Sequence, residues 1–154
     1  MVSSARPASE VVLASASAIR RQLLGNAGVR VRVSAANLDE KAYRGELAAK
    51  GIAEPAVIAL ELAKAKAVSI SRWERGCLVI GADQVLALGG ETVSKAQSLK
   101  AAKDVLMRLR GRKHDLHSGV AVARDGLVLW TALDTANLQM RSFSEGWLDR
   151  YLKE

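Results

Sequence analysis

The segment from Leu13 to Leu24 runs from an apolar stretch directly into a helical pattern that opens on two arginines. Val11–Leu13 is typical of a short buried strand, and Ser17 is a suitable N-cap for the helix that follows. A helix N-terminus presents unpaired N–H groups and a positive dipole end to an anion, and Arg20 and Arg21 add planar donors that suit phosphate oxygens. A strand that leads straight into such a helix indicates an α/β fold with an anion site. The alternative is a capped surface helix with two solvated arginines.

Composition narrows the class of protein. The chain has 154 residues, 49% of them hydrophobic, which is enough for one domain with a buried core and excludes a wholly disordered protein. Its 23 basic and 16 acidic residues give a net charge of +7, which favours an anionic partner such as a nucleotide, a nucleic acid or an anionic surface. Cys77 is the sole cysteine and lies in an apolar run, so we expect a small buried side chain rather than a nucleophile. Residues 1–10 lack the apolar core of a signal peptide and no run reaches membrane-spanning length, so we expect a cytoplasmic protein.

Strand-like and helix-like patterns alternate along the chain. Apolar or alternating runs predict strands over residues 11–13, 29–34, 77–82, 85–88, 117–124 and 127–140, with a turn at Gly89-Gly90. Helical periodicity and capping residues predict helices over residues 18–28, 42–51, 54–72, 101–110 and from 144 onward. No repeat, low-complexity run or linker divides the chain. We therefore expect residues 1–154 to form a single α/β domain.

The run Val79-Ile-Gly-Ala-Asp-Gln84 ends an expected buried strand on a carboxylate. Small residues before Asp83 leave room for a ligand, and open α/β sheets bind ligands at the C-terminal ends of their strands. The alternative is an aspartate that only caps a turn. Lys95 follows the glycine turn, so a hairpin would return its ammonium towards Asp83, whereas a solvated turn lysine is the ordinary alternative. Glu40 and Lys66 supply another carboxylate and another cation, and acids beside cations suit a phosphate and metal site.

The order of these residues resembles that of the Maf family of nucleoside triphosphate pyrophosphatases. The segments that carry the resemblance are Leu13-Ala-Ser-Ala-Ser-Ala-Ile-Arg-Arg-Gln-Leu-Leu24, Asp39-Glu40, Ala65-Lys66-Ala67, Gly81-Ala-Asp-Gln84, Ser94-Lys95, Leu109-Arg-Gly-Arg-Lys-His114 and Ser118-Gly-Val-Ala-Val122. Together they span nearly the whole chain. The resemblance implies an α/β domain with a mixed, twisted sheet flanked by helices around a central nucleotide groove.

The resemblance also implies a reaction, the hydrolysis of a nucleoside triphosphate between its α and β phosphates with a divalent metal, Mg²⁺ or Mn²⁺. Asp83 is implied as the general base and, together with Glu40, as a metal ligand. The implied phosphate-binding residues are Ser15, Ser17, Arg20, Arg21, Lys66 and Lys95. Substrate choice in the family is associated with the positions of Ile19 and Gln84, and the residues here are more similar to those of the branch that acts on 7-methyl-GTP. Ile19 also has a simpler explanation, since it forms a helical apolar stripe with Leu23 that suits a core.

The chain departs from the family pattern in two respects. Ala18 and Ala96 stand where the family usually has proline, which loosens turns without removing a functional group. The sequence also stops at Glu154, before a C-terminal segment that the family usually has, so we expect a domain truncated relative to the family.

The expected partner is a nucleoside triphosphate substrate, with no membrane and no nucleic acid, and a homodimer is left open. The alternative function is a catalytically weak nucleotide- or nucleic-acid-binding protein of the same fold, which the charge of +7 favours. His114 and His117 lie three residues apart in an expected strand and so on opposite faces, which argues against a shared zinc site.

Overall fold

The computed structural model describes residues 10–153. In chain order, its elements are β1 (Val11–Leu13), α1 (Ala18–Asn26), β2 (Arg32–Val33), α2 (Glu40–Ala49), α3 (Pro55–Ser71), β3 (Leu78–Leu88), β4 (Glu91–Val93), α4 (Leu99–Leu109), β5 (Lys113–Arg124), β6 (Leu127–Gln139) and α5 (Glu145–Tyr151). The predicted single α/β domain with a mixed sheet is confirmed for these residues.

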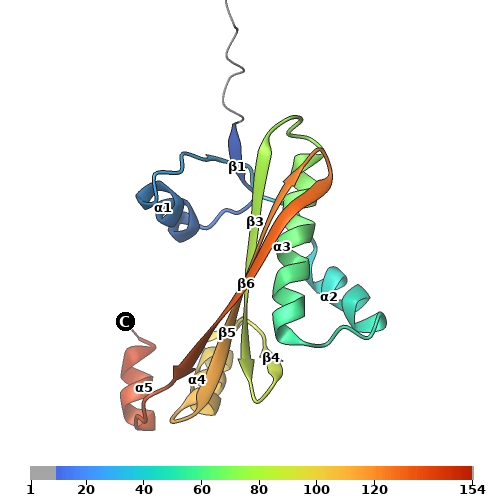
Figure 1. Cartoon of the computed structure of the whole chain (residues 1–154). Coiled ribbons are helices and arrows are strands. Elements are labelled where there is room, and N and C mark those ends of the chain that lie inside the picture. Colours follow the sequence, from blue (N-terminus) through green and yellow to red (C-terminus); the bar gives the residue numbers. More distant parts are fainter. Residues whose placement is uncertain (1–9, 154) are drawn as a thin grey trace, which may run out of the picture.

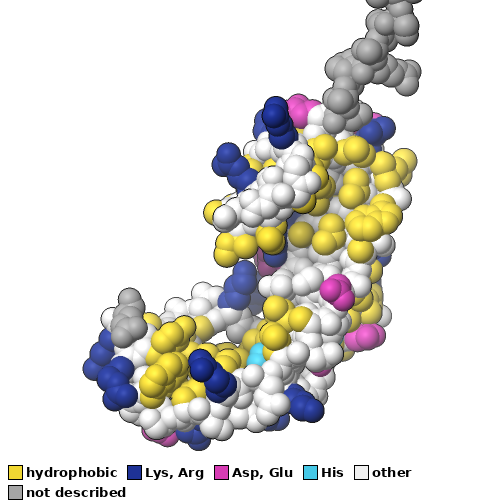
Figure 2. All heavy atoms as spheres, turned by 60° about the vertical axis from the view of Figure 1, so that its left-hand side comes forward, with side chains coloured by type: hydrophobic (Ala, Val, Ile, Leu, Met, Phe, Trp, Pro, Cys, Tyr) yellow, Lys and Arg dark blue, Asp and Glu magenta, His cyan; other side chains and the backbone are white. Residues whose placement is uncertain are grey.

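The six strands form one sheet in the order β2-β1-β3-β5-β6, with β4 paired to β3 outside this path. The pairs β2–β1 and β1–β3 are parallel, whereas β3–β4, β3–β5 and β5–β6 are antiparallel. Helix α3 runs along one face of the long strands (Figure 1), with α2 beyond it. Helix α1 lies towards the other side at one end of the strands, and α4 and α5 lie at the opposite end. Seen from that side, the molecule is hollowed between these two ends (Figure 2).

Two glycines allow α3 to lie close against the sheet. A Cβ added at Gly81 would lie 2.2 Å from the carbonyl oxygen of Ala63, and one at Gly119 would lie 2.6 Å from that of Ala59. The α3 residues at this contact, including Ala67, are small and fully buried. Helix α3 begins with Pro55 at a position where its missing N–H costs nothing, as the sequence predicts. This close packing fixes the position of the α3 side chains over β3.

The main correction to the predicted elements concerns β3. Two strands were expected over 77–82 and 85–88, but residues 78–88 form one continuous strand. Asp83 therefore lies in the middle of a strand and not at its end. The glycine turn at 89–90 does return the chain as a hairpin, through β4. The strand expected over 29–34 is reduced to Arg32–Val33, because only these residues pair with β1.

Two expectations concerned export and membranes. The expected lack of a signal peptide rests on the N-terminal residues, and positions 1–9 lie outside the described residues. Within the described part of the chain, no helix combines the length and the apolar character that crossing a bilayer requires.

Candidate functional site

A stretch of β3 lacks a neighbouring strand on one edge. β1 pairs with Leu78–Ile80, and the Ala14 N–H still reaches the Ile80 carbonyl at 2.8 Å. β4 pairs with Leu86–Leu88 on the same edge. Among the described residues no strand pairs with the edge at 81–85, and this gap contains Asp83 and Gln84. The sheet therefore opens at a point where its strand pairing changes from parallel to antiparallel, which is the kind of place where α/β sheets bind ligands.

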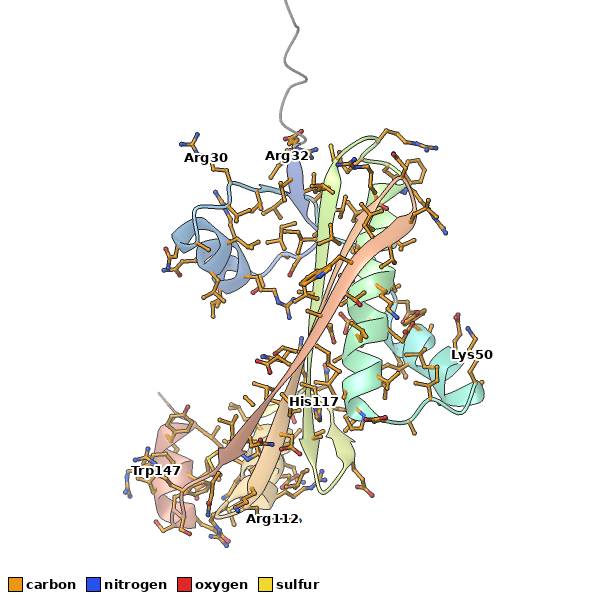
Figure 3. All side chains as sticks on the ribbon, viewed as in Figure 1. Arg30, Arg32, Lys50, Arg112, His117 and Trp147 are labelled. Carbon is orange, nitrogen blue, oxygen red and sulfur yellow. The ribbon has the colours of Figure 1, made fainter. Side chains whose placement is uncertain are left out.

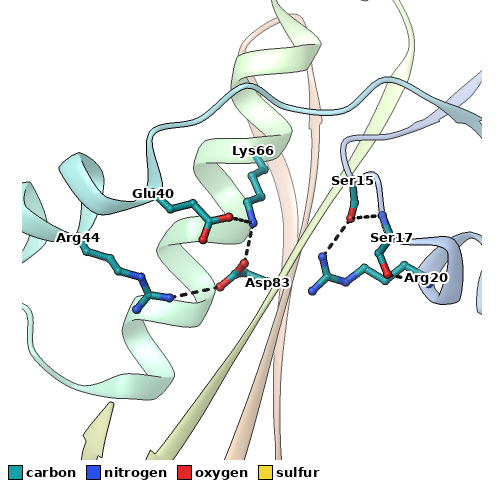
Figure 4. A network of polar contacts seen from close by, with 7 residues as sticks. All are labelled: Ser15, Ser17, Arg20, Glu40, Arg44, Lys66 and Asp83. Atoms are coloured by element: carbon teal, nitrogen blue, oxygen red, sulfur yellow. Dashed lines mark hydrogen bonds and ion pairs between the residues drawn. The ribbon is translucent and has the colours of Figure 1, made fainter. Parts of the chain in front are cut away.

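An ion network is centred on Asp83, as Figure 4 shows. The Lys66 ammonium donates a hydrogen bond to Asp83 Oδ1 at 2.6 Å and lies 2.7 Å from Glu40 Oε1. Arg44 Nη2 lies 3.8 Å from Asp83 Oδ2. Asp83 is only 7% exposed and Lys66 only 9%, so these charges are removed from water and depend on one another. The network joins α2, α3 and β3 at the open edge.

Helix α2 delivers two members of this network. It begins at Glu40, because the side chain of Asp39 accepts a hydrogen bond from the Ala42 N–H and caps the first turn. Arg44 lies one turn further along and so on the same face of the helix as Glu40. The predicted helix began only at residue 42, so this arrangement was missed.

Glu40 shows how the cations act on the acids. Partial burial works to raise the pKa of Glu40, but the hydrogen bond from Lys66 and the charges of Lys66, Lys95 and Arg44 together lower it below its ordinary value. Glu40 is therefore held in its charged form. Lys95 contributes from the segment after β4, so the hairpin does return this cation towards the acids, as the sequence predicts.

The N-terminus of α1 forms a second polar group on the other side of β3 (Figure 4). Ser17 caps the helix and accepts from the Arg20 N–H at 3.4 Å. Ser15 is buried, and its hydroxyl accepts from Arg20 Nη1 at 3.0 Å and from the Ser17 N–H at 3.3 Å. The guanidinium of Arg20 is thereby held across β3 from the acid network. Arg21 points elsewhere and lines a separate hollow of 440 Å³ with Gln22 and Val33.

A cleft of 660 Å³ passes around the open edge of β3. Its polar lining comes from α2, β3 and the segment after β4, and includes Glu40, Arg44, Asp83, Gln84, Ser94 and Lys95. The structure thus brings together Glu40, Lys66, Asp83 and Lys95 from distant parts of the sequence. Gln84 is exposed, and its Nε2 donates to Ser118 Oγ at 2.9 Å.

The apolar face of α1 differs from the expectation of a core stripe. Ile19 is 69% exposed and Leu23 is 62% exposed, so neither belongs to a core. Helix α1 contributes no buried residue at all. Ile19 is therefore available to a ligand beside Arg20.

The remaining candidates lie outside the cleft. His114 is buried and faces the Arg112 carbonyl, whereas His117 faces Thr135 Oγ1 at 2.8 Å from the other side of β5, as the spacing predicts. Within residues 10–153 no group of three or more histidine, cysteine or acidic side chains could hold a metal ion by itself. A hollow of 630 Å³ beside α5 is lined by Trp147 and Tyr151, whose rings stack at 5.2 Å. Figure 3 shows Trp147 to one side of His117. Cys77 is a free thiol of intermediate burial.

Comparison with known proteins identifies the family. Residues 10–154 match the family described as Maf-like protein, and the chain belongs to this family. The chain is 46% identical over 143 residues to a protein of Caulobacter vibrioides named nucleoside triphosphate pyrophosphatase, covering 93% of this chain and 71% of that protein. It is 42% identical over 142 residues to a 7-methyl-GTP pyrophosphatase of Rhizobium meliloti, covering 92% and 71%.

A solved structure shares the fold. A HAM1 protein from Coxiella burnetii superposes with a TM-score of 0.53 at 16% identity, covering 84% of this chain and 72% of that one. At this identity the likeness concerns the fold alone.

Proposed function

We propose that this protein hydrolyses nucleoside triphosphates between the α and β phosphates, releasing a monophosphate and pyrophosphate. The observation that carries the proposal is the buried Asp83 carboxylate at the open edge of β3, with Lys66 on one side and the Arg20 end of α1 on the other. The names of the relatives support it, since both are called pyrophosphatases of nucleoside triphosphates or of 7-methyl-GTP.

The cations bind the phosphate chain. Arg20 holds a fixed orientation through Ser15 and offers its remaining N–H groups to phosphate oxygens, which are strong charge-assisted acceptors. Lys95 lines the cleft from the segment after β4. Lys66 forms ion pairs with two carboxylates, those of Glu40 and Asp83, and can donate its third proton to a phosphate oxygen. Arg21 contributes less to phosphate binding than Arg20, because it lines another hollow.

Asp83 acts on the attacking water. Its Oδ2 is buried and has no hydrogen-bond partner among the described residues, with Arg44 Nη2 at 3.8 Å as a neighbouring charge. This oxygen accepts a proton from a water molecule while the water oxygen forms a bond to the α phosphorus. The bond from the α phosphorus to the bridging oxygen breaks, and pyrophosphate leaves with the electron pair. Lys66 holds the Asp83 carboxylate in position by its hydrogen bond to Oδ1.

A divalent cation, Mg²⁺ or Mn²⁺, fits the same residues. The carboxylates of Asp83 and Glu40 supply hard oxygen donors, and two carboxylates plus phosphate oxygens and water are a common set for Mg²⁺. Such an ion would neutralise charge that develops on the phosphates. Glu40 is kept charged at neutral pH by Lys66, Lys95 and Arg44, as such a role requires.

Substrate choice is assigned to Gln84 and Ile19. Gln84 is exposed at the open edge next to Asp83, and Ile19 is exposed beside Arg20, so both lie where a nucleoside attached to the phosphates would pass. We favour 7-methyl-GTP among the substrates, following the relative of that name. The charge of +7 favours the second candidate, a nucleotide- or nucleic-acid-binding protein without turnover.

The test is pyrophosphate release from a panel of normal and methylated nucleoside triphosphates with Mg²⁺ or Mn²⁺. Asp83→Asn should abolish release and leave nucleotide binding largely intact, because the amide keeps the size of the carboxylate but cannot take a proton. Asp104→Asn, which removes an exposed acid of α4, is the matched control and should behave as the parent. Binding without release by the parent protein would support the second candidate, and equal release by Asp83→Asn would remove Asp83 from the mechanism.

A further inference from the structure

A row of three polar side chains crosses the sheet face opposite α3. Asp83 points to α3, so its neighbour Gln84 points to the other face. The strand register places Ser118 of β5 opposite Gln84, and Asp134 of β6 opposite Ser118. Cross-strand partners share a face, so the three side chains form one line. The line extends away from the edge where Asp83 lies, over two strand spacings or about 10 Å.

The hydrogen bonds of this row leave acceptors exposed. Gln84 Nε2 donates to Ser118 Oγ at 2.9 Å, which leaves the carbonyl oxygen of Gln84 free to accept. Asp134 uses one carboxylate oxygen to accept from the Thr135 N–H at 2.9 Å, and its side chain is exposed. A ligand on this face therefore meets a fixed carbonyl oxygen at one end of the row and a negative charge at the other.

The surroundings of the row are apolar. The residues that alternate onto the same face beside it are Ala82, Val120, Ala132 and Ala136, with Trp130 further along β6. The structure describes all of residues 80–86, 116–122 and 130–136 of β3, β5 and β6. Among them, Asp134 is the only residue on this face whose side chain carries a formal charge. An apolar surface with a few oriented polar groups suits the binding of a nucleobase.

We propose that Gln84, Ser118 and Asp134 form the floor of the base site, and that Asp134 selects a positively charged purine, 7-methylguanine, over guanine. The proposal rests on the proposed function, because the phosphates at the edge of β3 place the nucleoside over this row. Methylation at N7 gives the purine a positive charge and changes its shape by one methyl group, so a carboxylate under the ring discriminates by charge. Ser118 is a positioning residue, which holds the Gln84 amide so that its oxygen meets the N–H groups of the base.

The experiment compares the affinities for 7-methyl-GTP and GTP by calorimetry, in an Asp83→Asn background so that the ligands are not consumed. We expect 7-methyl-GTP to bind more tightly, by roughly three- to tenfold, as expected for one added charge pair near a protein surface. Asp134→Asn keeps the shape of the side chain and should bring the ratio close to one by weakening 7-methyl-GTP binding alone. Asp104→Asn removes the same charge from an exposed site on α4 and should leave the ratio unchanged.

Ser118 is tested by a different readout. Ser118→Ala frees the Gln84 amide and should weaken binding of both nucleotides to the same extent. Ser118→Thr should restore the binding because the hydroxyl returns.

Two outcomes would overturn the proposal. The first is that Asp134→Asn leaves the ratio of the affinities for 7-methyl-GTP and GTP equal to that of the Asp83→Asn background. The second is that the background binds GTP as tightly as 7-methyl-GTP. Pyrophosphate release by the parent protein is measured separately, so a failed base site is distinguished from a failed enzyme assignment.

Discussion

Replacing Gly81 with alanine tests whether the contact between α3 and the sheet holds the site together. The new Cβ would lie 2.2 Å from the Ala63 carbonyl oxygen and 2.6 Å from the Ala67 nitrogen, and real Cβ contacts essentially never fall below 3.0 Å. Both atoms belong to the backbone of α3, so the helix must move away by about 0.8 Å. Overpacking of this kind costs about 1 to 3 kcal/mol, and we expect the upper end because no flexible side chain absorbs the clash.

The same shift carries Lys66 away from Asp83, because Lys66 precedes Ala67 in α3 and its hydrogen bond to Asp83 is 2.6 Å long. Urea unfolding of Gly81→Ala should therefore show a free energy of unfolding lower by about 3 kcal/mol, accompanied by reduced pyrophosphate release. Gly45→Ala is the matched control, because Gly45 lies inside α2 with nothing within 4 Å of an added Cβ. It should stabilise the protein by up to about 1 kcal/mol through helix propensity. A Gly81→Ala protein within 0.5 kcal/mol of the parent, roughly the range of a neutral surface substitution, would refute this account of the packing.

Two further predictions concern the charged groups. Arg20→Ala should weaken triphosphate binding, measured by calorimetry, by about 1 to 3 kcal/mol. Arg21→Ala should weaken it by much less, because only Arg20 is held across β3 from Asp83. Equal losses of affinity in the two variants would contradict this assignment. The pKa of Glu40 is lowered on folding, so its contribution to stability is present above its ordinary value of 4.5 and is lost as the pH falls through the lower folded value. Glu40→Gln should accordingly flatten the acid side of a plot of unfolding free energy against pH, and parallel curves for the two proteins would exclude this linkage.

Local patterns in the sequence were sufficient to predict most helices. Ser17 and Ser144 cap α1 and α5 as expected, and Pro55 marks the start of α3. These features depend on a few adjacent residues, whose side chains satisfy the free N–H groups of a helix terminus or tolerate its geometry. Asp83 was also predicted as a site residue because an apolar run precedes it, and Lys66 as a further cation, whereas their roles were implied by the resemblance to a family.

The placement of the site depends on contacts between distant segments, which the sequence does not display. β3 was predicted as two strands because the polar pair Asp83-Gln84 interrupts its apolar pattern, yet the strand continues, since β5 pairs with it on the other edge from Val79 to Ala87. Arg44 was missed because its role requires α2 to lie beside Asp83. Asp134 was missed for the same reason, since its position follows from the register of β3, β5 and β6.

The polar pair in β3 explains why one strand can serve two separate tasks. Successive residues of a strand point to opposite faces, so Asp83 reaches the cations under α3 while Gln84 reaches the open face. Between β1 and β4 the edge of β3 has no partner among the described strands, and the cleft at this point is lined by both Asp83 and Gln84. If β3 ended at Asp83, this alternation would be lost and both side chains would lie in one loop. The continuous strand therefore separates the groups proposed to act on the phosphates from those proposed to recognise the base.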